Sequence, residues 1–177
     1  ATPGAAYRVP EQQRDWPTAQ QMTALLLAHG VEVRQAPNGD YWNPMAQPYG
    51  RFITEMLTPQ RYPEVRLQPG KDILRPYDIA TWTLPLQMDV QVDAVTEPLS
   101  SQQRSGLRKI EKFTVPEGNV AGSGPAYVVS HKANTSFKTI NEVLGAAGVH
   151  GGFAPSEVEA AAGTEHCACI IIRCEKG

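Results

Sequence analysis

The stretch that decides the fold lies between residues 47 and 88. Its two most distinctive pieces read QPYGRF at residues 47–52 and PYDIATWTLPLQM at residues 76–88. It is the densest run of aromatic residues, prolines and polar residues in the chain. A segment with a short strand, a helix and a second strand is expected on either side of it. The stretch is therefore predicted to be a rigid connector packed between two related halves.

The apolar periodicity of the two flanking segments predicts the same order of elements. The predicted elements are a strand at 6–9, a helix capped by Asp15 or Thr18 that ends near 29 and a strand at 31–34, and then a strand at 126–129, a helix capped by Asn134 or Ser136 and an extended piece from 149. Parallel strands need a crossover connection, and a helix is the usual one. The predicted fold class is α/β, with a mostly parallel central sheet, helices on both faces and two strand–helix–strand halves.

The length of 177 residues suits one domain, predicted to span residues 1–177. Its halves are expected at about 1–57 and 126–177. A connector rich in proline and aromatic residues at 58–95 and a surface excursion at 96–125 join them. Residues 109–115 form a strand within that excursion.

Composition and charge exclude two classes of partner. The net charge of −2 gives no basic face for nucleic acid. No apolar run reaches the roughly 18 residues that a membrane-spanning helix needs. No cofactor is expected. The glycine-rich stretch at residues 122–125 precedes a strand, whereas a phosphate cradle needs such a loop between a strand and a helix N-terminus.

Polar residues gather where ligands bind in open α/β sheets, which is at the carboxyl ends of strands beside helix N-termini. Those residues are Arg14 and Asp15 in the first half and His131, Lys132 and Asn134 in the second. They form the predicted ligand-binding group. Helix capping in a solvated loop is the other role that the same residues allow.

The most metal-like cluster is His166, Cys167 and Cys169, with Cys174 close behind. Thiolates and imidazoles are zinc ligands, and a closed site needs four. Cysteines two residues apart on a strand share one face, so small apolar packing residues explain this pair as well. The packing interpretation is preferred.

The decisive stretch also carries a family resemblance. Residues 45–52 (MAQPYGRF), 59–63 (PQRYP) and 76–88 resemble the region that follows the catalytic domain in large bacterial zinc carboxypeptidase-like metallopeptidases. That region is similar to a class I glutamine amidotransferase-like α/β domain. The resemblance covers roughly residues 6–172, and its specific part is 45–88. It implies a periplasmic or secreted location, since such proteins are usually exported.

The catalytic parts of that family do not accompany the resemblance. His29 and Glu32 have the spacing of a zinc pair, but one ends a predicted helix and the other lies in a predicted strand. None of the cysteines lies between glycines, as a nucleophile elbow requires. We therefore expect a non-catalytic accessory or interaction domain whose partner is a protein or a catalytic domain of the same parent. The alternatives are a hydrolytic enzyme with a site near His131 and a subunit of a larger assembly.

Overall fold

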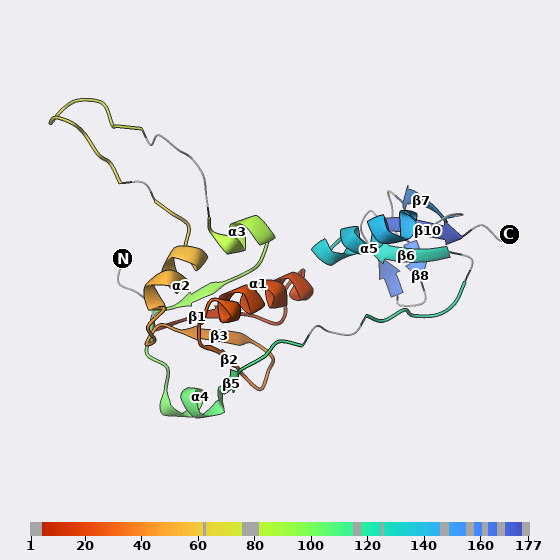
Figure 1. Ribbon diagram of the computed structural model, residues 1–177, viewed down its shortest axis with the longest axis horizontal. Coiled ribbons are helices and arrows are strands. Elements are labelled where there is room, and N and C mark those ends of the chain that lie inside the picture. The colour runs from red at the N-terminus through yellow and green to blue at the C-terminus, as the bar shows by residue number, and fades with distance from the viewer. Residues whose placement is uncertain are drawn as a thin grey trace. The chain divides into compact units, whose positions relative to one another are not determined.

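The computed structural model describes residues 5–61, 63–75, 82–114, 118–124, 126–145, 149–154, 158–160, 163–165 and 169–174. The chain divides into two compact units (Figure 1). Unit 1 contains Ala1–Glu11 and Met22–Lys112, and unit 2 contains Gln12–Gln21 and Phe113–Gly177.

Unit 1 is built on a five-stranded sheet in the order β4-β1-β3-β2-β5. Its elements, with the helix α1 that enters from unit 2, are β1 (Ala6–Val9), α1 (Trp16–Ala28), β2 (Val33–Gln35), β3 (Tyr41–Pro44), α2 (Gly50–Leu57), α3 (Leu84–Met88), β4 (Asp93–Val95), α4 (Ser101–Gly106) and β5 (Arg108–Ile110). Fully buried apolar residues come from β1, α1, β2 and α2. They include Val9, Met22, Leu26, Val33 and Ile53.

The prediction of a mostly parallel sheet is wrong, because every described strand pair is antiparallel. The turn at Asn38-Gly39 returns the chain as β3, and β3 lies between β1 and β2. Tyr41 pairs with Val9 on one side and with Gln35 on the other. β1 and β2 therefore run in the same direction, as their helical crossover requires, but each is hydrogen-bonded to β3.

Unit 2 repeats this arrangement. Its elements are β6 (Ala126–Ser130), α5 (Asn134–Leu144), β7 (Val149–Ala154), β8 (Val158–Ala160), β9 (Gly163–Glu165) and β10 (Cys169–Cys174). The strand order β6-β10-β7 places β10 between two strands joined by α5, while β8 and β9 form a separate hairpin. Ile140 and Ile172 are buried together, with Val129 and Val143 packed against them.

Two helices differ from their prediction. The sequence predicts a helical turn or two over residues 77–84 that stops near Pro85. α3 instead begins at Leu84, and Pro85 lies in its first turn, where its missing N–H is not needed. Residues 77–81 of that predicted segment lie outside the described residues. α4 occupies part of the predicted excursion and begins with a capping box of Ser100 and Gln103. Across the described residues, no helix has the length and apolar character of a membrane span.

Candidate functional site

The predicted ligand-binding group is partly assembled in unit 2, around the carboxylate of Asp15. This buried carboxylate caps α1, since its Oδ1 accepts from the Thr18 amide at 3.0 Å and its Oδ2 accepts from the Thr18 hydroxyl at 2.6 Å. The same Oδ2 accepts from the backbone N–H of Asn134 at 2.7 Å. Asn134 is the first residue of α5, whose own N-cap Ala133 supplies no side-chain acceptor. Asp15 therefore places a carboxylate at two helix N-termini, which is where a bound anion is stabilised.

The other members of the predicted group lie in different settings. Arg14 and Lys132 are exposed. Lys132 donates its backbone N–H to the Ser130 hydroxyl at 3.4 Å. His131 is half-buried, and its Nδ1 is a buried atom with no hydrogen-bond partner in the described structure. The capping role left open by the sequence is the one that Asp15 has.

The predicted metal cluster cannot be placed. His166 and Cys167 lie outside the described residues, and Cys169 begins β10 opposite Ser130 and Ala154. Elsewhere in the described residues, no group of three or more histidine, cysteine and acidic side chains is arranged to hold a metal ion.

The motif at residues 47–52 fastens α2 to the turn between α1 and β2. The side-chain amide of Gln47 pairs with the backbone of Glu32 as a neighbouring strand would. Its Oε1 accepts from the Glu32 N–H at 2.6 Å, and its Nε2 donates to the Glu32 carbonyl at 3.0 Å. Nε2 also donates to the Pro44 carbonyl at 2.7 Å. One amide thus joins the start of β2 to the end of β3.

Two aromatic rings of the same motif cover the end of α1. Gly30 has a φ of 89°, and a Cβ there would lie 3.1 Å from the Tyr49 ring, so the turn needs glycine for both its conformation and its contact. The Phe52 ring stacks on His29 with centroids 5.7 Å apart. His29 Nδ1 lies 2.8 Å from the Leu25 carbonyl oxygen, and Glu32 forms an ion pair with Arg34 at 2.7 Å. His29 and Glu32, which have the spacing of a zinc pair, therefore make local contacts around the turn between α1 and β2.

A cavity of about 420 Å³ adjoins this contact in unit 1. It is lined by Leu27, Gly30, Val31, Glu32, Gln47, Pro48, Tyr49, Lys109, Ile110 and Glu111. Its volume lies in the range of about 300–1,000 Å³ that is typical of small-ligand sites. The lining includes the apolar residues Leu27 and Val31 and the charged residues Glu32, Lys109 and Glu111. We take this cavity as the candidate binding site.

A second cavity, of about 380 Å³, lies at the other end of β5. It is lined by Gln35, Ala36, Pro37, Gly39, Gly106 and Arg108. The Arg108 guanidinium donates to the Gln35 side-chain oxygen at 3.1 Å, which ties β5 to β2. The two cavities therefore share one strand, whose residues line both.

At the opposite edge of the sheet, a charge network joins β4 to β1. Arg8 contacts Asp93 at 2.7 Å and Asp40 at 3.8 Å. Partial burial raises the pKa of Asp93, but hydrogen bonds from Arg8 and Gln91, together with the Arg8 charge, outweigh burial and lower this pKa below its ordinary value. Both side chains of this pair are only partly buried, so solvent screens the interaction and its role is structural and modest.

Comparison of the chain with protein-family models, curated proteins and solved structures returned no match. The candidate site therefore rests on geometry. Sequence reasoning identified the motif at 47–52 but missed the cavity, because segments 27–32, 47–49 and 109–111 meet only through the strand order of the sheet. The one signal in the sequence was the predicted strand at residues 109–115, whose first residues line the cavity.

Proposed function

We propose that the chain is a non-catalytic accessory or interaction domain of an exported zinc carboxypeptidase-like protein, acting in the periplasm or outside the cell. Its partner is a protein surface, in the first instance the catalytic domain of the same parent. The resemblance of residues 45–88 supports the family, and the observation that carries an interaction role is the segment 63–75, here named the arm (Figure 1).

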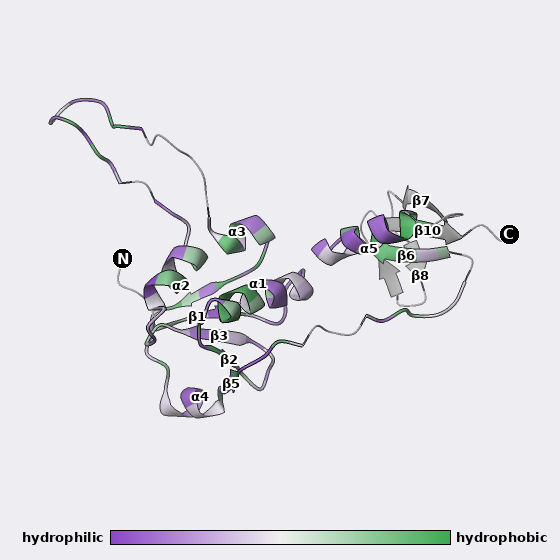
Figure 2. Cartoon of the chain, in the orientation of Figure 1, coloured by the Kyte–Doolittle hydropathy of each residue, from purple (hydrophilic) through white to green (hydrophobic). Residues whose placement is uncertain are grey.

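The arm holds large apolar side chains in water. Val65, Leu67, Ile73 and Leu74 are exposed by 40–80%. The Leu74 N–H donates to the Val65 carbonyl at 2.7 Å, so apolar residues of the two limbs lie across from one another. Figure 2 shows apolar and polar residues interspersed along the arm. Grouped apolar side chains at a protein surface mark interaction sites more often than isolated ones do.

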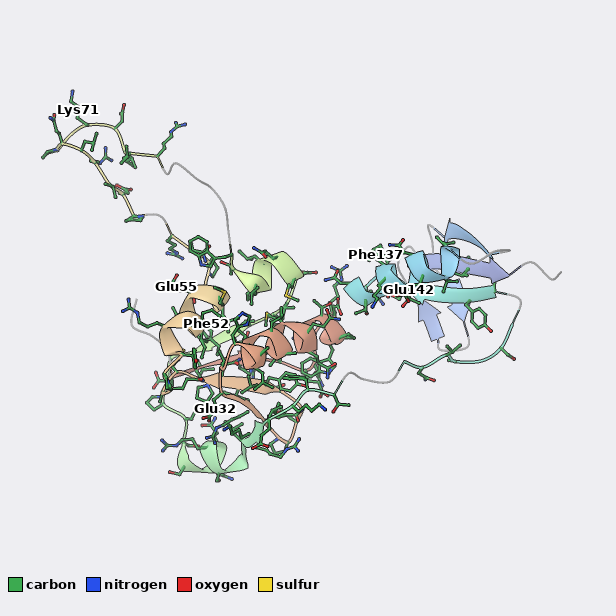
Figure 3. All side chains as sticks on the ribbon, in the orientation of Figure 1. Glu32, Phe52, Glu55, Lys71, Phe137 and Glu142 are labelled. Atoms are coloured by element: carbon green, nitrogen blue, oxygen red, sulfur yellow. The ribbon has the colours of Figure 1, made fainter. Side chains whose placement is uncertain are left out.

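The arm has local order of its own. The Lys71 N–H donates to the Gln68 carbonyl at 3.2 Å and closes a turn at the tip, where Figure 3 labels Lys71. The Arg66 guanidinium donates to the Lys71 carbonyl and lies 3.6 Å from Glu64. A preformed loop loses less conformational entropy on binding than a disordered one. These contacts favour a docking element.

A binding titration tests the interaction role. The remainder of the parent polypeptide, expressed separately, is titrated with the chain by calorimetry. We expect saturable binding that is lost when Leu67 and Ile73 are both replaced by aspartate. The control is Val120→Asp, because Val120 is 71% exposed, close to the 80% of Leu67, but lies outside the arm. Absence of binding by the unmodified chain, or equal binding by the arm variant, would refute the role.

Assays of the isolated chain test its lack of catalysis. We expect no hydrolysis of peptide or glutamine substrates and no zinc in elemental analysis. Turnover of either substrate would overturn the proposal. Stoichiometric zinc that disappears when Cys167 and Cys169 are replaced would also overturn it.

A further inference from the structure

Among the described strands, none pairs with the outer edge of β5. β5 ends the sheet order, and its only described partner is β2, with Ile110 opposite Val33 and Lys109 opposite Arg34. An edge strand presents unpaired N–H and C=O groups on its outer side, and an extended peptide can bind them as an added strand.

The cavity of about 420 Å³ beside β5 provides a place for a side chain of such a strand. Ile110 lines the cavity of about 420 Å³, together with Leu27, Val31 and Tyr49. Tyr49 is 44% exposed, so its ring is accessible at this site. Directly paired residues on neighbouring strands point to the same face of a sheet. An apolar residue placed opposite Ile110 would therefore reach this cavity.

The charge around β5 selects the kind of peptide. Residues 101–112 contain Arg104, Arg108, Lys109 and Lys112 against the single acid Glu111, a net charge of +3 in a chain whose net charge is −2. Among the described residues, no ion pair is formed by Lys109. A residue opposite Lys109 on an added strand shares its face, so an acidic residue there would pair with Lys109, whereas Arg34 on β2 is already paired with Glu32.

We propose that the β5 edge is a docking site for an extended acidic peptide segment. The segment adds as a strand, with an apolar residue opposite Ile110 and acidic residues opposite Lys109 and Arg108. This site goes beyond the proposed function, since it is separate from the arm and does not depend on it. The arm of a second copy is a poor occupant, because residues 63–75 carry three basic and two acidic side chains, a net charge of +1, and would meet a basic edge.

The probe is the capped peptide acetyl-Thr-Leu-Glu-Glu-Thr-amide, which has this register in the antiparallel direction. It is titrated into the full chain labelled with nitrogen-15, and the backbone amide shifts are recorded. We expect saturable shifts at residues 108–111. A peptide with both glutamates replaced by lysine should bind at least about tenfold more weakly. A peptide with methylated backbone nitrogens should not bind, because it cannot form the strand ladder.

Protein variants separate the edge from the arm. Lys109→Glu should weaken binding of the acidic peptide about tenfold, and Lys109→Gln should have an intermediate effect. Lys71→Glu makes the same charge change on the arm and should leave peptide binding unchanged. Circular dichroism confirms that each variant is folded.

Three outcomes would overturn the proposal. The first is no saturable binding of the acidic peptide to the unmodified chain. The second is equal binding of the acidic and lysine peptides. The third is a dimer of the unmodified chain that Lys109→Glu dissociates, since the occupant of the edge would then be a second copy. None of these outcomes depends on the calorimetric titration of the arm, so failure of the proposed function would not count for or against the β5 docking site.

Discussion

Gln47 provides the sharpest test of how unit 1 is held together. Gln47→Glu keeps the shape of the side chain and the acceptor for the Glu32 N–H, but it replaces the donor that serves the carbonyls of Glu32 and Pro44. Two net hydrogen bonds of about 0.5–1.5 kcal/mol each are lost, and facing oxygens add about 1–3 kcal/mol. We expect the free energy of unfolding to fall by about 2–6 kcal/mol near pH 7.

The same variant has a pH signature that a loss of packing lacks. A protonated carboxyl donates one hydrogen bond, so it restores part of the contact with the two carbonyls. The folded state disfavours the carboxylate, and the pKa of the introduced group therefore lies above its unfolded value of about 4.3. The stability that the protonated carboxyl contributes is fully present below the unfolded pKa and is lost as the pH rises through the folded pKa. The difference in the free energy of unfolding between Gln47→Glu and the unmodified chain should therefore decrease as the pH is lowered.

Urea unfolding followed by circular dichroism measures this gap at several pH values. Gln47→Ala should cost about 2–4 kcal/mol from the three lost hydrogen bonds, with no dependence on pH beyond that of the unmodified chain. The control Gln102→Glu places the same charge at an exposed position in α4 and should be near neutral. If Gln47→Glu matches this control, or if its gap stays constant in acid, the strand-like role of the amide is wrong.

The remaining predictions concern Asp15, Gly50 and Asp93. Asp15→Ser retains a capping oxygen for α1 but is too short to reach Asn134, so it should cost about 1–2 kcal/mol in urea unfolding. Asn134→Pro removes the same N–H at a helix position that suits proline, and in a double-mutant cycle with Asp15→Ser the two costs should not add. Gly50→Ala should lower the stability measured by thermal unfolding by about 1–3 kcal/mol, because its Cβ would lie 2.5 Å from the Met45 carbonyl oxygen. This clash outweighs the higher helix propensity of alanine, and an unchanged or higher melting temperature would contradict it. Asp93→Asn should lower the free energy of unfolding by about 0.2–1 kcal/mol near pH 7. Because the folded pKa of Asp93 is lowered, this difference should vanish as the pH falls from about 3.9 through the folded pKa. A difference that persists in acid would exclude the ion pair as its cause.

Local patterns in the sequence were sufficient for most of the helices and strands. Asp15 and the apolar spacing of Met22 and Leu26 predict α1, and the alternation at residues 6–9 predicts β1. The prediction of a mostly parallel sheet was wrong for one reason. Asn38-Gly39 is a sequence signal for a hairpin turn, but neither this signal nor the apolar periodicity determines that the returning strand enters between β1 and β2.

The candidate sites show the same division between local and distant information. The position of Asp15 before a helix indicated its capping role, whereas its hydrogen bond to Asn134 joins residues that are remote in the chain. Gln47 lies in the motif that decided the fold, yet its partner Glu32 is set by a long-range contact of an amide with backbone. No single-residue propensity encodes such a contact, because it depends on two segments arriving together.

The strand inserted into each sheet has a consequence for synthesis on the ribosome. In unit 1 the inserted strand β3 follows β2 after a short turn, so the pairing is completed soon after β2 emerges. In unit 2 the inserted strand is β10, which begins at Cys169, while β7 ends at Ala154. Until β10 is translated, the facing edges of β6 and β7 carry unpaired backbone groups, which are prone to wrong pairing. A stop codon or a protease cut just before residue 169 would therefore remove the centre of that sheet, not its margin.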